Sequence, residues 1–135
     1  MIHLLLPLLL LVSSLTGEIQ AGELPGDSET RSRLSQLLIA AIRYDVFNGR
    51  CRGFVSSQHA DNVETLTIGK FGMTLAQLSD ELAARRLPIL VREVRDRVVK
   101  EILDLGGCRR AKQLGYLERL RTEYQRLYRW LSDYP

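Results

Sequence analysis

The amino-acid sequence predicts an all-α protein, a small bundle of roughly four to five helices closed by one long-range disulfide. Apolar residues recur every three or four positions through most of the chain, which is the spacing of one buried helix face. Short turns containing glycine, proline or asparagine separate these segments, and such connections favour neighbouring packed helices. The chain contains 2 cysteines, Cys51 and Cys108.

The N-terminal segment predicts export. Residues 1–21 hold an apolar run, a polar stretch and then Ala21 just before Gly22. The run is shorter than the roughly 20 apolar residues that a bilayer requires, and its order is that of a cleavable signal peptide. We expect a periplasmic or secreted protein without stable membrane insertion, in which 22–27 form a flexible leader and 28–135 a single helical domain.

The first predicted helix covers about residues 28–47. Asp27 or Ser28 can cap it, because either side chain can accept hydrogen bonds from unpaired backbone N–H groups. Its apolar positions are Leu34, Leu37, Leu38, Ala41 and Ile42. Residues 48–49, Asn-Gly, tolerate left-handed backbone angles and are expected to end the helix.

Two segments of different character follow. A shorter helix is expected over about residues 50–58, with Cys51, Phe54 and Val55 directed into the core. Residues 59–73 show no clean helical period and are expected to form the longest irregular segment. Long ordered loops are often functional, but a packed connector is the interpretation that we favour.

The C-terminal half predicts three further helices. Thr74 and Gln77 have the spacing of a capping box, which begins a helix over about residues 75–86. Pro88 suits the first turn of the next helix, and a glycine pair ends it. A regular apolar stripe predicts the last and longest helix over about residues 108–132.

Cys51 and Cys108 are predicted to form a disulfide, because exported proteins pass through an oxidising compartment. They are too far apart for a CxxC motif. A catalytic thiol or a metal site would need further groups, and His59 is the one histidine beyond the predicted signal peptide. We therefore expect a structural bridge, which in the entropic model contributes about 4 kcal/mol.

No convincing set of catalytic residues is present. The best candidate group is His59 with the carboxylates of Asp61 and Glu64, a spacing that is common by chance. An exposed loop histidine is more often solvated than catalytic. We expect no catalytic residue, no cofactor and no metal, and keep a small hydrolase using His59 as the least favoured alternative.

The charge pattern argues against nucleic acid. The formal net charge is +3, and acids alternate with the arginines, so no strong field for a polyanion is implied. The candidate binding residues lie on the last predicted helix: Arg109, Arg110, Lys112, Tyr116, Tyr128 and Trp130. Aromatic residues with polar tips are favoured at interfaces. We expect a protein partner, with an acidic surface as one option and a homodimer through this helix as another.

The stretch CRGFVSSQ, residues 51–58, resembles the first-cysteine helix of small Gram-negative periplasmic helical proteins. These are acid-stress chaperones and the immunity proteins that block type VI secretion amidases. The resemblance implies an exported, mostly helical protein with a long-range disulfide. The second cysteine departs from that pattern, since here it opens a long C-terminal helix. We expect macromolecular binding, as an inhibitor, immunity or assembly factor, with a periplasmic stress chaperone as the alternative.

Overall fold

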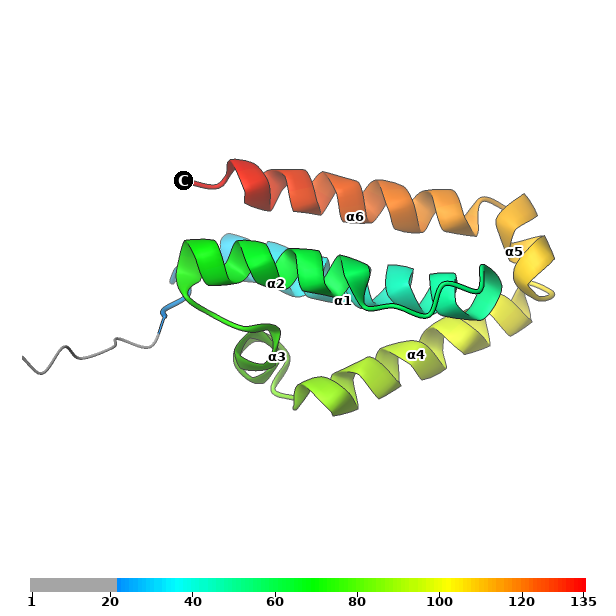
Figure 1. Cartoon of the computed structure of the whole chain (residues 1–135), viewed down its shortest axis with the longest axis horizontal. Coiled ribbons are helices and arrows are strands. Elements are labelled where there is room, and N and C mark those ends of the chain that lie inside the picture. Colours follow the sequence, from blue (N-terminus) through cyan, green and yellow to red (C-terminus); the bar gives the residue numbers. More distant parts are fainter. Residues whose placement is uncertain (1–21) are drawn as a thin grey trace, which may run out of the picture.

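The computed structural model describes residues 22–135, and over this range the chain forms six α-helices and no strand. They are α1 (Ser28–Cys51), α2 (Gln58–Phe71), α3 (Leu75–Ala83), α4 (Leu87–Asp104), α5 (Cys108–Gln113) and α6 (Tyr116–Asp133). In Figure 1, α6 runs antiparallel to α1 on one side, α4 lies on the other, and α5 turns the chain between them. The predicted all-α class is confirmed. The predicted signal peptide lies outside the described residues.

α1 is the central helix and contacts each of the other five. It buries residues on several faces, among them Leu34, Leu37, Leu38, Ala41 and Phe47. A helix that is apolar on more than one face belongs inside a bundle. The carboxylate of Asp27 accepts the N–H of Thr30 at 2.9 Å, which confirms one of the two predicted caps.

α1 continues through the predicted stop at Asn48, whose side chain is buried rather than turned out. Asn48 Oδ1 accepts a hydrogen bond from Arg52 Nη1 at 3.0 Å. The backbone carbonyl of Asn48 accepts the N–H groups of both Arg52 and Phe54 at 3.1 Å. These bonds end the helix after Cys51, one turn later than the sequence predicts.

The prediction of a short helix over residues 50–58 is wrong. Residues 52–57 form a non-helical connection, and Gly53 turns it with a φ of 73°. Phe54 and Val55 are 60% and 89% exposed instead of packed in the core. The resemblance to a first-cysteine helix therefore does not extend to the conformation of this stretch.

The prediction of an irregular segment over residues 59–73 is also wrong, because α2 occupies nearly all of this range. Thr67 takes a core-facing position four residues after Val63, and both are buried. Its hydroxyl donates to the carbonyl of Met73 at 2.9 Å, which satisfies the buried polar group. A polar residue on the buried face obscured the helical period. Gly72, with a φ of 65°, ends the helix.

The predicted start of α3 is confirmed and its end is corrected. Thr74 Oγ1 accepts the N–H of Gln77 at 3.2 Å, and Gln77 Oε1 accepts the N–H of Thr74 at 2.9 Å, which completes the capping box. The helix ends at Ala83 instead of near residue 86, because Ala84 adopts a left-handed φ of 49°. Pro88 lies in the first turn of α4, as predicted.

The single helix predicted over residues 108–132 is two helices. Gly115 has a φ of 82°, which breaks the chain between α5 and α6. The break lets α6 turn back along α1, where it buries Leu120, Tyr124, Leu127 and Leu131. Among residues 22–135 no helix has the length and hydropathy needed to cross a membrane.

The disulfide joins the end of α1 to the start of α5. Cys51 and Cys108 lie 57 positions apart in the sequence, with their Cα atoms 5.3 Å apart. The predicted pairing is confirmed. Three helices, α2, α3 and α4, therefore lie within one covalently closed loop.

Candidate functional site

The disulfide gathers basic side chains from two distant segments at one end of the molecule. Arg50 and Arg52 flank Cys51, while the other three lie on α5. We call this set the basic end: Arg50, Arg52, Arg109, Arg110 and Lys112, all exposed. It lies where α5 connects the two sides of the bundle in Figure 1. Sequence analysis identified the three α5 cations and missed the two arginines, which the bridge brings to them.

None of these five cations forms an ion pair with a carboxylate of residues 22–135. Arg52 donates to a neutral amide and its guanidinium lies 5.3 Å from the ring centre of Phe54. Lys112 Nζ donates to the carbonyl of Cys51 at 3.1 Å. Arg109 lies in the first turn of α5, where the helix dipole disfavours cations, whereas Arg110 and Lys112 lie in the last turn, where it favours them. No carboxylate of residues 22–135 neutralises the charge of the basic end through an ion pair.

Tyr116 does not belong to an exposed surface, contrary to the expectation for the last helix. It is 5% exposed, and its hydroxyl donates to Glu101 Oε2 at 2.5 Å. Arg43 Nη2 donates to the same oxygen at 3.0 Å. Burial, together with the bond to Glu101, raises the pKa of Tyr116. Tyr116 therefore ties α6 to α1 and α4.

Tyr128 and Trp130 lie in the C-terminal half of α6, away from the basic end. Both are half-buried. The ring of Trp130 is 5.8 Å from that of Tyr134, and the guanidinium of Arg33 lies 5.5 Å from the indole centre. The structure thus places the predicted binding residues in three separate environments.

His59 pairs with a carboxylate that sequence reasoning did not consider. Its Nδ1 lies 2.7 Å from Asp45 Oδ1, and its backbone N–H donates to the same oxygen at 3.1 Å. The other oxygen of Asp45 accepts the N–H of Ala60 at 2.9 Å. Asp45 comes from α1, so this carboxylate caps α2 from the neighbouring helix.

The predicted group of His59 with Asp61 and Glu64 is not assembled. Asp61 accepts the hydroxyl of Ser57 at 2.9 Å, and Glu64 accepts the N–H of Leu75 at 2.9 Å. Among residues 22–135 His59 hydrogen-bonds to no serine, threonine or cysteine, so no activated nucleophile is formed there. The described part of the chain also contains no cluster of His, Cys, Asp or Glu arranged to hold a metal ion.

The imidazole of His59 is packed between aromatic rings. The ring centre of Tyr44 lies 4.0 Å away, and that of Tyr124 lies 4.9 Å away, edge to face. Desolvation in this cluster raises the pKa of Tyr124 to about 12, against a hydrogen bond with Asn62 that lowers it. The histidine is not the exposed loop residue that the sequence predicts.

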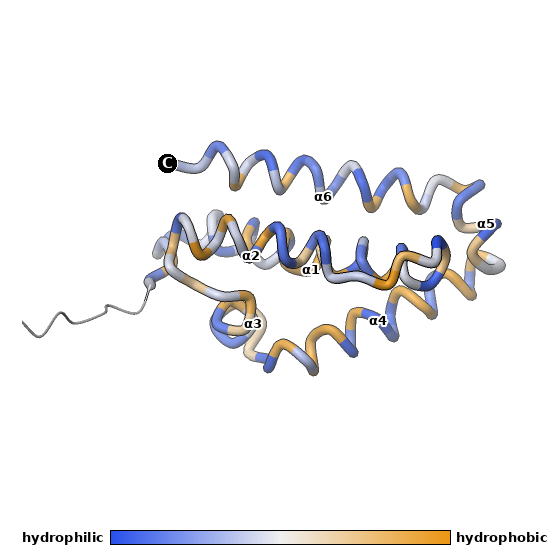
Figure 2. Tube along the Cα trace, viewed as in Figure 1, coloured by the Kyte–Doolittle hydropathy of each residue, from blue (hydrophilic) through white to orange (hydrophobic). Residues whose placement is uncertain are grey.

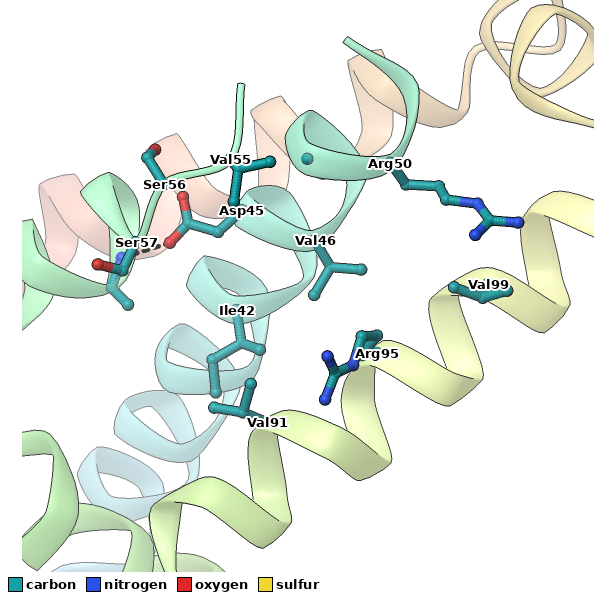
Figure 3. A pocket seen from close by; sticks show the side chains of 12 residues that line it. Ile42, Asp45, Val46, Arg50, Val55, Ser56, Ser57, Val91, Arg95 and Val99 are labelled. Carbon is teal, nitrogen blue, oxygen red and sulfur yellow. Dashed lines mark hydrogen bonds between the residues drawn. The ribbon is translucent and has the colours of Figure 1, made fainter. Parts of the chain in front are cut away.

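An apolar groove with a volume of about 380 Å³ lies between α1, α4 and the connection 52–57 (Figure 3). α1 contributes Ile42 and Val46, and α4 contributes Val91 and Val99. Figure 2 shows that apolar residues follow much of α4, whereas α6 is mostly polar. Sequence reasoning missed the groove, because it depends on residues 52–57 leaving the core.

No protein-family model, curated protein or solved structure matches this chain.

Proposed function

We propose that the protein is an exported helical binding protein whose basic end docks on an acidic surface of a protein partner. The observation that carries the proposal is the set of five neighbouring cations without an ion-pair partner in the described residues. Guanidinium groups bind carboxylates in a bidentate way, which gives both charge and geometry.

Apolar contact is available beside these charges. Phe54 and Val55 are largely exposed and are separated from Arg52 only by Gly53. Specific interfaces combine an apolar or aromatic centre with a polar rim, and arginine is enriched in them. The basic end would steer an acidic partner, while Phe54 and Val55 would supply contact area.

The location and role that we propose are supported by further features. The disulfide is compatible with the periplasm or the extracellular space, and the N-terminal sequence pattern supports export. An inhibitor, immunity or assembly factor needs a stable protein contact of this kind. A stress chaperone is the second candidate, and its signature would be new apolar surface on acidification. The packed environment of His59 gives a hydrolase no support.

The test is capture of a partner by the oxidised protein beginning at Gly22, from the periplasm and medium of the source cells. The basic-end variant carries Arg109→Glu and Arg110→Glu. The matched control carries Arg92→Glu and Arg97→Glu on α4, two arginines that are also exposed and without an ion pair in the described residues.

We expect one stoichiometric protein that binds the wild type and the control, is lost with the basic-end variant, and binds with lower affinity as salt rises. Equal binding by both variants would contradict the proposal. So would a partner whose affinity does not depend on salt.

A further inference from the structure

The apolar groove has the dimensions of a small-molecule site. Its lining runs from Ile42 to Arg50 on α1 and from Val91 to Val99 on α4. Each stretch covers about 12 Å at a rise of 1.5 Å per residue. The volume of about 380 Å³ falls within the roughly 300–1,000 Å³ that is usual for ligand pockets.

The wall of the groove is made mainly of aliphatic side chains. Val46, Val91 and Val99 are half-buried and Val55 is exposed, so water contacts apolar surface inside a concave site. Covering this surface with an apolar ligand would be favourable. Ser56 and Ser57 line one part of the groove, but over the valine and isoleucine lining a peptide would bring backbone N–H and C=O groups against side chains that cannot bond them, which is costly. An acyl chain has no such groups.

The charged groups that line the groove and have no ion-pair partner in the described residues are both positive. Asp45 is the one carboxylate among the lining residues, and it already accepts hydrogen bonds from His59 and Ala60. Arg50 and Arg95 also line the groove, and neither forms an ion pair within residues 22–135. In Figure 3 the guanidinium group of Arg50 lies beside Val99, and that of Arg95 lies between Val46 and Val91.

We infer that this groove binds a free medium-chain fatty acid, with the alkyl chain along the aliphatic lining and the carboxylate at Arg95. A guanidinium pairs with a carboxylate through two parallel hydrogen bonds. The inference goes beyond the proposed function. Arg50 and Val55 belong to both surfaces, but Arg95 lies outside the basic end, and Arg109 and Arg110 do not line the groove, so variants at these positions distinguish the two proposals.

Titration calorimetry with decanoate below its micelle concentration tests the site, using the oxidised protein that begins at Gly22. Decanol and decyltrimethylammonium serve as neutral and cationic probes of the same chain length. We expect saturable 1:1 binding of decanoate, about tenfold tighter than that of decanol, and weaker binding of the cation. Arg95→Gln should weaken decanoate about tenfold and leave decanol unchanged.

Gly49 offers a variant that places a new side chain in the groove, at a position where a Cβ fits. It lies inside α1 and lines the groove, and an added Cβ would meet the nearest atoms at an ordinary 3.9 Å. Gly49→Leu should therefore abolish binding of both decanoate and decanol. The control, Gly69→Leu, places the same side chain on α2 with nothing within 4 Å of its Cβ, and it should bind like the wild type.

Circular dichroism of both leucine variants checks that each keeps its helices. Equal affinity for the anionic and cationic probes, or unchanged decanoate binding by Gly49→Leu, would overturn the inference. Binding to phosphatidylglycerol vesicles without binding to monomeric decanoate would also overturn it, in favour of a membrane surface.

Discussion

The carboxylate of Asp45 accepts a hydrogen bond from the backbone N–H of His59, fourteen positions later in the chain. The same carboxylate lies 2.7 Å from Nδ1 of the His59 ring. The contact links two helices, because Asp45 lies in α1 and His59 lies in the first turn of α2. α2 has no capping bond from the side chain of its own N-cap residue, Ser57. The cap is supplied by tertiary structure.

Replacement of Asp45 should therefore destabilise the protein. Asp45→Ala would leave the N–H groups of His59 and Ala60 without their acceptor, and we expect a loss of about 2–3 kcal/mol in the free energy of unfolding. Urea titration followed by circular dichroism measures it. Asp61→Ala removes an exposed carboxylate from the same turn and should cost less than about 1 kcal/mol. Equal losses would contradict the capping role.

Removal of the disulfide should lower stability without changing the fold. The double variant Cys51→Ser, Cys108→Ser opens a loop of 57 positions, and the entropic model gives a loss of about 4 kcal/mol. Denaturant titration of the variant and of the reduced wild type should give the same midpoint. A loss below about 1 kcal/mol would show that the bridge contributes little.

The free energy of unfolding should fall in alkaline solution, because the buried phenol of Tyr124 ionises there. Desolvation raises its pKa from 10.0 to about 12, so the folded protein holds the phenolic proton more tightly than the unfolded chain. The resulting stabilisation is complete below about pH 10 and is lost as the pH rises through about 12, by up to about 3 kcal/mol. Tyr124→Phe should flatten the decline of the unfolding free energy above pH 10 more than Tyr128→Phe does.

Substitution by alanine should destabilise the protein at Gly115 and stabilise it at Gly69. Its φ of 82° disfavours any residue with a Cβ, so Gly115→Ala should cost about 1–2 kcal/mol. Gly69 lies inside α2 with open space at its Cβ, and Gly69→Ala should stabilise the protein by about 0.5–1 kcal/mol. Thermal unfolding of the two variants gives the comparison, and shifts of the same sign would contradict it.

Periodicity and capping chemistry predicted the parts of the fold that depend on local sequence. The capping box at Thr74 and the cap at Asp27 are formed as expected, and the Cys51–Cys108 pairing followed from the predicted compartment. α2 was missed because its buried face includes Thr67, which becomes compatible with the core through a hydrogen bond to Met73. That carbonyl comes within reach only when α2 has formed and Gly72 turns the chain back at its end.

The candidate sites depended on contacts between distant residues. The predicted disulfide implies that the residues flanking the two cysteines are neighbours in space. Only that additional inference would have grouped Arg50 and Arg52 with the cations of α5. Asp45 could not be assigned to His59 while residues 59–73 were expected to be irregular. The groove required the exposed position of Val55, which the expected helix over 50–58 would have buried.

Folding also determines when the concentrated positive charge of the basic end exists. Its arginines and lysine come from two segments that the unfolded chain holds far apart, each with the weak field of an ordinary basic stretch. Folding brings the two segments together, and the bridge then holds them there. The unfolded chain therefore presents its charge dispersed to any acidic macromolecule, and only the folded protein presents the concentrated surface.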